Sequence, residues 1–245
     1  MPTIILTRAD DDNERTAREL RRDDWLVESV PMIELRPIEH DRAELEALAH
    51  ATIGAIVLLT SAHATRRWLE LRHGAFAAAT PSGYLVVGAS SAALLAAADP
   101  SIPVLAVATS AAGLASVLPP GITRVLYPCS TARRDEAIAM LTERSVDVIE
   151  LPLYEPRLPD GAAARLERIL AAATPPTAIV FFSPSAVANW FSLRSDIPSD
   201  SIFVAIGPTT AEALRALGVE RITTAGGGTG ESLVEAIDRS LARGA

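Results

Sequence analysis

The sequence predicts an α/β fold in which parallel sheets are covered by helices on both faces. Short apolar runs alternate with stretches of helical periodicity, such as ERTARELRR and DEAIAMLTER, along all 245 residues. Apolar residues make up 49% of the chain and aromatic residues only 4%, which is typical of Ala-rich helices packed on buried strands. Three segments also recur in the same order at one spacing, which indicates an internal duplication.

Ten short apolar runs are the candidate strands, and most are separated by stretches with a period near 3.6 residues. They lie at 4–6, 26–30, 55–59, 84–87, 104–107, 124–127, 146–151, 178–182, 202–206 and 221–223. Alternation of strands and helices along a chain favours parallel sheets. We therefore expect these runs to form parallel sheets.

The duplication consists of three pairs of similar segments. They are VPMIELR (30–36) with LPLYEPR (151–157), VLLTSAHA (57–64) with VFFSPSAVA (180–188), and VVGASSAALLAAA (86–98) with AIGPTTAEALRAL (205–217). The offsets are 121, 122 and 119 residues. One such match could arise by chance in an Ala-rich chain, but three in order predict two related halves.

Prolines divide each half into a two-strand piece and a three-strand piece. Pro31, Pro37, Pro152, Pro156 and Pro159 fit poorly in a central strand, so their segments are predicted to be linkers or an edge ladder. Two strands alone are too few for a stable sheet. Each two-strand piece must join three strands of its own half or of the other half, and periodicity does not choose between them.

The composition excludes several classes of protein. A net charge of −8 argues against general nucleic-acid binding, and all 22 basic residues are arginine. The lack of lysine excludes Schiff-base catalysis and a P-loop. A single cysteine, Cys129, excludes an internal disulfide, and the four histidines show no metal-ligand spacing. With no membrane-length apolar run and no signal-peptide pattern, we expect a cytoplasmic protein.

Hydroxyl residues and a glycine stand where apolar runs pass into helical patterns, and they are the candidate anion-binding residues. The first amides of a helix lack intrahelical partners and favour an anion. Helix capping is the alternative role of each hydroxyl, and a phosphate would fit similar helix starts. The candidates are Thr60, Ser61, Ser91, Ser183, Ser185, Thr209, Thr210 and Gly207, the last for close approach of a ligand to the backbone.

Arginines near strand ends are candidates for binding carboxylates. Arg8 follows the first predicted strand and suits a bidentate carboxylate contact, although it could instead pair with the nearby acidic residues at 10–12. Arg133 and Arg134 follow YPCST, at the position in the second repeat that corresponds to Arg8 in the first. Cys129, beside them, is expected to pack as a small side chain rather than to react.

Several motifs together resemble those of the uroporphyrinogen-III synthase family. They are ILTRADDDNERTAREL near the start, VLLTSAHA, VVGASSAALL, LPLYEP, FFSPSAVANWF, AIGPTTAEALRALG and, near the end, TTAGGGTGESLVEAI. They follow the family order and cover essentially the full chain. The chain departs from the pattern at Ala9, where the family often has proline, and at His63, where it tends to have asparagine, so we expect at most a polar contact from His63.

The resemblance implies a two-domain architecture. Two flavodoxin- or Rossmann-like parallel-sheet domains would be joined by a two-stranded hinge near 31–38 and 152–159, with a ligand cleft between them. One domain would contain residues 1–35 and 158–245, and the other would contain residues 37–153.

The resemblance also implies an activity in heme biosynthesis. The protein would be a lyase that cyclises hydroxymethylbilane, a linear tetrapyrrole, to uroporphyrinogen III with inversion of ring D and loss of water. Tyr154 in LPLYEP matches a tyrosine of the family's hinge and would donate a proton to the departing hydroxyl, or else pack as hinge filler. The family implies no cofactor and no metal.

For partners, we expect a monomer that binds neither nucleic acid nor membranes, with transient hand-over of substrate from the enzyme that forms the bilane. Two other classes stay open at this stage. A non-catalytic two-lobed binding protein or sensor for an anionic small molecule would share the architecture. A phosphate- or nucleotide-handling transferase would use the same helix starts, but the lack of lysine and of a Walker loop disfavours it.

Overall fold

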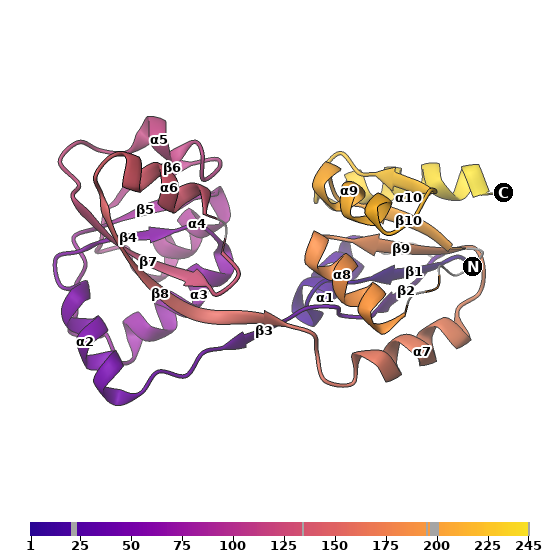
Figure 1. Ribbon diagram of the computed structural model, residues 1–245, viewed down its shortest axis with the longest axis horizontal. Coiled ribbons are helices and arrows are strands. Elements are labelled where there is room, and N and C mark those ends of the chain that lie inside the picture. Colours follow the sequence, from indigo (N-terminus) through magenta and orange to yellow (C-terminus); the bar gives the residue numbers. More distant parts are fainter. Residues whose placement is uncertain (21–23, 134, 195, 197–200, 245) are drawn as a thin grey trace. The chain divides into compact units, whose positions relative to one another are not determined.

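The chain forms two compact units (Figure 1). The computed structural model describes residues 1–20, 24–133, 135–194, 196 and 201–244. We call the unit of Met1–Leu35 and Arg157–Ala245 the terminal domain, and the unit of Arg36–Pro156 the central domain. Among the described residues, no helix is both long and apolar enough to cross a bilayer.

The terminal domain is built on a five-stranded sheet in the order β11-β10-β9-β1-β2, and its neighbouring strands are parallel. Its elements are β1 (Thr3–Leu6), α1 (Asp10–Glu19), β2 (Leu26–Ser29), α7 (Ala162–Ala172), β9 (Thr177–Phe181), α8 (Pro184–Leu193), β10 (Ser201–Ala205), α9 (Pro208–Ala216), β11 (Ile222–Thr224) and α10 (Gly230–Gly244).

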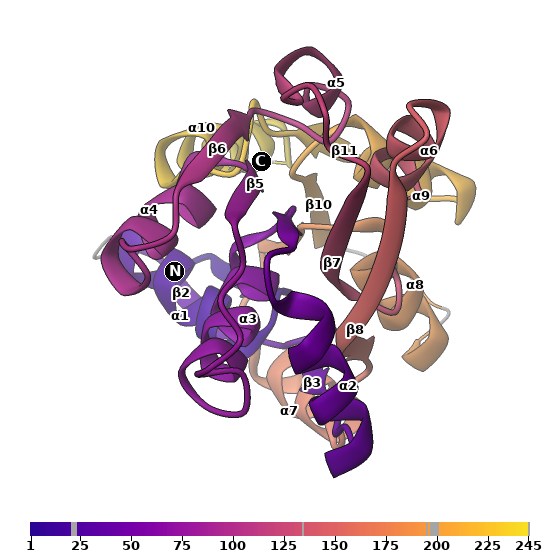
Figure 2. The ribbon, with the colours of Figure 1, turned by 90° about the vertical axis from the view of Figure 1, so that its left-hand side faces the viewer.

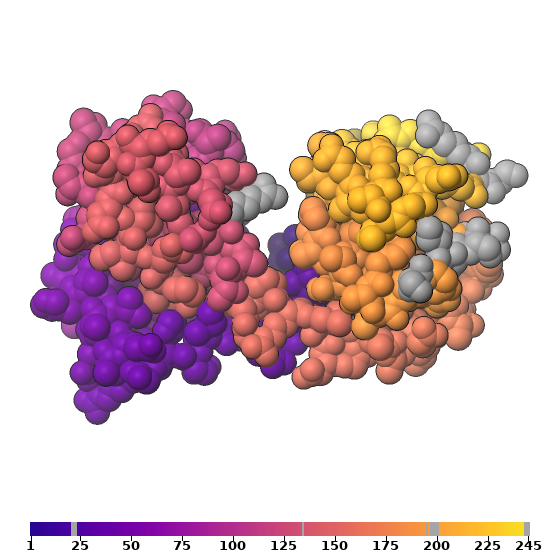
Figure 3. All heavy atoms as spheres, viewed as in Figure 1, coloured from indigo at the N-terminus to yellow at the C-terminus, as the bar shows by residue number. Residues whose placement is uncertain are grey.

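Side chains of the terminal sheet alternate between two hydrophobic cores. Ile5 packs with Trp190 of α8 and Leu214 of α9, whereas Ile4 packs with Ile237 of α10. Neighbouring residues of a strand point to opposite faces, so a sheet covered on both sides needs continuous apolar strands. Figure 1 shows α8 and α9 over one face of this sheet, and their atoms cover it in the space-filling view (Figure 3).

The central domain is built on a six-stranded sheet in the order β3-β8-β7-β4-β5-β6, whose strands are labelled in Figure 2. Its elements are β3 (Glu34–Pro37), α2 (Arg42–Thr52), β4 (Ile56–Leu59), α3 (Ala62–His73), β5 (Gly83–Val87), α4 (Ala89–Ala98), β6 (Val104–Ala108), α5 (Leu114–Val117), β7 (Arg124–Ser130), α6 (Glu136–Glu143) and β8 (Asp147–Arg157). Pairings from β8 through β6 are parallel.

The two sheets contain strands exchanged between the two halves of the sequence. In the terminal domain, β1 and β2 of the first half stand beside β9, β10 and β11 of the second half. In the central domain, β7 and β8 stand beside β4, β5 and β6. Of the two arrangements that the sequence left open, the strand order therefore selects exchange. Each sheet also acquires a point where the strand order reverses, between β1 and β9 and between β4 and β7.

The proline-rich segments form a ladder at one edge of the central sheet. The sequence does not predict β3, and its predicted run at 146–151 continues as β8 through Pro152 and Pro156 to Arg157. Pro152 lies opposite Cys129, immediately before an irregularity in the β7–β8 register, so the strand accommodates a residue that lacks an N–H donor. Both β3 and β8 cross a boundary between the two domains.

A buried polar network joins α3 and α4 in the central domain. The Tyr84 hydroxyl donates to Asp99 Oδ2 at 2.7 Å, and Arg72 Nε lies 3.4 Å from the same oxygen. Arg72 also donates to the Phe76 carbonyl at 2.9 Å. Asp99 and Arg72 are both buried. A buried charge without its partner is costly, so the pair constrains this part of the fold.

We predict that Asp99→Ala destabilises the protein by about 3–5 kcal/mol, because Arg72 would be left buried without a counter-charge. Asp147→Ala is the matched control, since Asp147 pairs with Arg124 at 2.8 Å with side chains 59% and 65% exposed. That change should cost less than about 1 kcal/mol. Urea unfolding of the two variants measures the difference, and equal losses would contradict a special role for the buried pair.

Candidate functional site

Two equivalent serines, one in each domain, stand at the start of a helix that follows the carboxyl end of a strand in the middle of the sheet. Ser61 precedes α3 and its Oγ accepts the Ala64 N–H at 3.1 Å, while Ser183 precedes α8 and accepts the Ala186 N–H at 3.2 Å. Both are N-caps, so the capping role is real for each. They follow β4 and β9, the strands that border the two reversal points.

Two equivalent glycines begin the next helices but differ in conformation. Gly88, before α4, has φ +89°, which favours glycine. Gly207, before α9, has φ −167°, an extended conformation open to any residue. A Cβ atom added to Gly207 would have no protein atom within 4 Å. The fold itself therefore does not require glycine at position 207.

The first turns of α4, α8 and α9 expose some of the predicted residues and bury others. Ser185 and Thr209 are exposed. Ser91 and Thr210 are each only 1% exposed, because both occupy the third position of their helices and face the core. In this structure these two hydroxyls lie beneath the helix starts, which favours support of the helix starts over direct contact, and their predicted part in ligand binding stays a prediction.

A cavity of about 390 Å3 lies at the reversal point of the terminal sheet. It is lined by residues that follow β1, β9 and β10, including Arg8, Phe182, Ser183 and Ile206, and by Gly228. In open parallel sheets, ligands bind beyond the carboxyl ends of the strands at such a point. The cavity thus brings together two of the predicted binding residues, Arg8 and Ser183.

Arg8 is held in place by its own loop. Its guanidinium lies over the Phe182 ring, 4.9 Å from the centroid, and donates to Asp12 at 3.2 Å. The buried Asn13 accepts the Arg8 N–H at 2.9 Å and donates to the Leu6 and Arg8 carbonyls. Of the two roles considered from the sequence, the structure shows the pairing with an acidic residue, and binding of a substrate carboxylate stays a prediction. Asn13 was missed, since its contacts appear only once the loop has folded.

Two hydroxyl–tyrosine pairs lie at the reversal point of the central sheet. Thr60 Oγ1 is 3.1 Å from the Tyr127 hydroxyl, and Ser61 Oγ is 3.2 Å from the Tyr154 hydroxyl. Burial raises the pKa of both phenols, and the hydrogen bonds to Thr60 and Ser61 partly offset that rise. Both phenols are therefore protonated at neutral pH. Sequence reasoning missed Tyr127, because the pair depends on β7 lying beside β4.

A family model described as uroporphyrinogen-III synthase HemD matches residues 14–235 of the chain. The chain belongs to the uroporphyrinogen-III synthase family. It is thus an enzyme of heme biosynthesis.

Solved structures of uroporphyrinogen-III synthases share the fold. A mutant enzyme from the extremely thermophilic bacterium Thermus thermophilus matches with a TM-score of 0.65 and 20% identity, over 99% of this chain and 100% of that one. The enzyme from Helicobacter pylori matches with a TM-score of 0.65 and 17% identity, over 98% and 99%. The expected α/β fold with two parallel sheets is confirmed.

Three other side chains near the tyrosines of this synthase family member pack or form ion pairs within the fold. His63 packs edge-on against the Tyr154 ring, with centroids 4.4 Å apart. Cys129 is buried, and burial raises the pKa of its thiol to about 11, so it packs as predicted. Arg133 is bound by Glu150 and Asp135, whereas Arg134 lies outside the described residues. Arg133 is thus already neutralised by two carboxylates.

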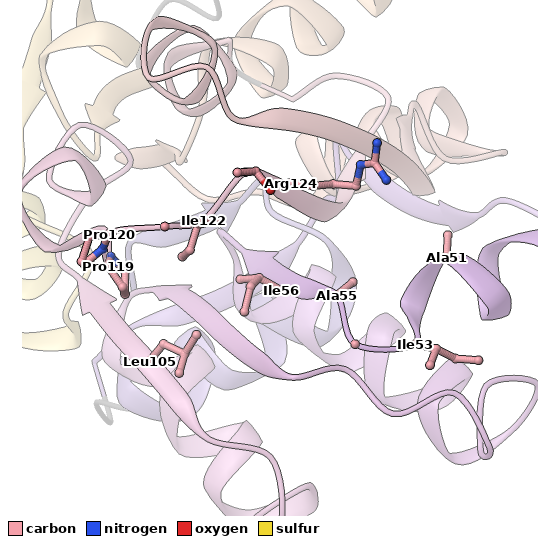
Figure 4. A pocket seen from close by; sticks show the side chains of 12 residues that line it. Ala51, Ile53, Ala55, Ile56, Leu105, Pro119, Pro120, Ile122 and Arg124 are labelled. Atoms are coloured by element: carbon pink, nitrogen blue, oxygen red, sulfur yellow. The ribbon is translucent and has the colours of Figure 1, made fainter.

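A second cavity, of about 490 Å3, lies at the opposite edge of the central sheet (Figure 4). It is lined by Ile56 and Arg124, the first residues of β4 and β7, together with Leu105, Ile53 and Pro120. None of the predicted site residues lines it. Ligand sites of open α/β sheets lie at the carboxyl edge, so the larger cavity is not the preferred candidate.

Within the described parts of the chain, no three His, Cys, Asp or Glu side chains gather as a metal site would need. The groups that do converge at the two reversal points are hydroxyls, phenols, helix-start amides and one arginine. These groups can bind carboxylates, and a phenol can supply a proton. They suit an anionic organic substrate.

Proposed function

We propose that this chain is a lyase that cyclises hydroxymethylbilane to uroporphyrinogen III, with inversion of ring D and loss of water. Membership of the uroporphyrinogen-III synthase family carries the proposal. Donor groups at the carboxyl edge of both sheets support it, because the substrate is a flexible tetrapyrrole with acetate and propionate side chains. A simple binding protein would need the donors but not a proton source such as Tyr154.

Local donors must bind the substrate carboxylates, because the protein carries a net charge of −8 and would repel a polyanion at long range. We propose direct contacts from Arg8, Thr60, Ser61, Ser183, Ser185, Gly207 and Thr209. Ser91 and Thr210 would support the helix starts from below rather than touch the ligand. Several such contacts to one substrate molecule would restrict its conformations.

Tyr154 is the proposed proton donor. As the hydroxymethyl C–O bond breaks, the pyrrole nitrogen's electron pair stabilises the azafulvene cation, and the Tyr154 proton leaves with the oxygen as water. Ser61 lies 3.2 Å from the phenol oxygen and would donate to the phenolate as it forms. After carbon–carbon bond formation through a spiro intermediate, the final pyrrole carbon loses a proton, which can restore the phenol.

The main contribution of the protein is then conformational. The activated bilane can also close directly, without inverting its last ring. Several anchored carboxylates would hold the chain so that the spiro route is faster than direct closure. This division of work explains why few acid–base groups stand beside many donors.

The decisive experiment incubates the protein with hydroxymethylbilane and separates uroporphyrinogens I and III after oxidation. We expect mostly type III with the protein, against type I in its absence. No excess of type III over the protein-free reaction would overturn the proposed function and favour a binding protein.

Tyr154→Phe should lower kcat by about 10- to 1000-fold while leaving measurable type III product, since positioned proton transfer is one of several contributions. The ring is retained, so packing against His63 is preserved. Rates are measured by single-turnover assays, with circular dichroism to check folding. Full loss of activity in a folded variant, or no change at all, would contradict this division of roles.

Gly207→Ala should raise the KM for hydroxymethylbilane about 10-fold with little change in stability, because the fold leaves space at this Cβ and the ligand would occupy it. Gly88→Ala is the contrasting variant at the equivalent position. Its φ of +89° is strained for alanine, so its urea midpoint should fall. An unchanged KM in Gly207→Ala would remove Gly207 from the binding site.

A further inference from the structure

The three tyrosines of the chain all lie in the central domain, and each places its hydroxyl against another polar side chain. Tyr84 belongs to the Asp99 network, and Tyr154 has the proposed proton-transfer role. Tyr127 has no role in the function proposed above. It lies on β7, is 3% exposed, and packs in the core that includes Leu58, Cys129 and Leu141.

The Tyr127–Thr60 contact joins the two strands on either side of the reversal point. Thr60 follows the last residue of β4, and Tyr127 lies midway along β7. The distance between the hydroxyl oxygens is 3.1 Å. Thr60 is partly exposed while Tyr127 is buried, so the contact connects the core to the surface where a ligand would bind.

The direction of this hydrogen bond follows from acidity. A phenol, with a pKa near 10, is a stronger donor than an aliphatic alcohol. The geometry allows either oxygen to donate, and the difference in acidity favours Tyr127 as the donor and Thr60 Oγ1 as the acceptor. A threonine hydroxyl has one proton, so an oxygen that accepts from Tyr127 keeps its proton for a partner on the exposed side.

We infer that Tyr127 is a positioning residue that turns the Thr60 hydroxyl into a fixed donor for a substrate carboxylate. The inference rests on the proposed function. It also distinguishes the two pairs at the same edge of the sheet. Tyr127 donates to Thr60 and acts in binding, whereas Tyr154 would give its proton to the substrate, and Ser61 would then donate to the phenolate that forms.

The two tyrosines should therefore differ in kinetics. Tyr127→Phe leaves Thr60 free to rotate its hydroxyl away from the substrate. KM should then rise about five- to tenfold, as expected for the loss of one hydrogen bond, and kcat should change less than about twofold. Tyr154→Phe should lower kcat. Tyr84→Phe is the matched control: it removes a buried phenol hydroxyl from the Asp99 network, and should lower the urea midpoint while leaving KM unchanged.

A double-mutant cycle tests whether Tyr127 acts through Thr60. Thr60→Val should raise KM as much as Tyr127→Phe or more, and Thr60→Ser, which keeps the hydroxyl, should stay near the wild-type KM. In the Thr60→Val background, Tyr127→Phe should add less than about twofold. Effects on KM that multiply would overturn the inference, as would a Tyr127→Phe enzyme with unchanged KM or with a fall in kcat alone.

Failure of this inference is distinguishable from failure of the proposed function. A wild-type enzyme that makes type III product while Tyr127→Phe keeps its KM overturns only the role of Tyr127. A wild-type protein that makes no type III product overturns both. If Tyr127→Phe does not fold, the comparison of Thr60→Val with Thr60→Ser decides, since equal KM values for these two would show that the Thr60 hydroxyl binds nothing.

Discussion

The positions of Arg8, Thr60, Ser61 and Ser183 depend on the reversal of strand order within each parallel sheet. At such a point, the connections after two neighbouring strands leave toward opposite faces, so the strand ends are not covered by one continuous loop. In the terminal domain this occurs between β1 and β9, where the 390 Å3 cavity lies. In the central domain it occurs between β4 and β7, where Thr60 meets Tyr127. The exchange of strands between halves thus creates one candidate site in each domain.

At these points the atoms that stabilise helix starts are also the ones that would bind substrate in the proposed function. Ser61 Oγ accepts the Ala64 N–H and so stabilises the start of α3, yet its hydroxyl also has a second lone pair and a proton, of which the contact with Tyr154 uses only one. Ser183 is in the same position at α8. One hydroxyl can therefore cap a helix and bind a ligand at the same time. For this reason, a capping hydrogen bond does not show whether the hydroxyl also binds a ligand. Gly207 says more about binding, because neither its backbone conformation nor its packing requires glycine.

Local pattern was enough to predict most of the strands, the helix starts and the Ser61 and Ser183 caps, since each depends on neighbours in sequence. Contacts between strands distant in sequence were out of reach: the Tyr127–Thr60 pair spans 67 residues and requires the order β7-β4. The short β3 was missed because it has little apolar signal and is formed by pairing with β8. Burial of Ser91 and Thr210 also could not be read from the motif, because it depends on which side of the first turn packs on the sheet.

In this acidic protein, an arginine proposed to bind a substrate carboxylate, such as Arg8, lies close to carboxylates of the protein itself. In the proposed function Arg8 would bind a substrate carboxylate although Asp12 already contacts it at 3.2 Å. Their side chains are 32% and 30% exposed, and a pair open to water contributes at most about 1 kcal/mol, so an incoming carboxylate can displace or share the contact at little cost. Meanwhile Asn13 fixes the backbone and Phe182 supports the guanidinium plane. In the proposed function, these contacts would keep the Arg8 side chain oriented between turnovers, and the exposed Asp12 pair would not block the ligand.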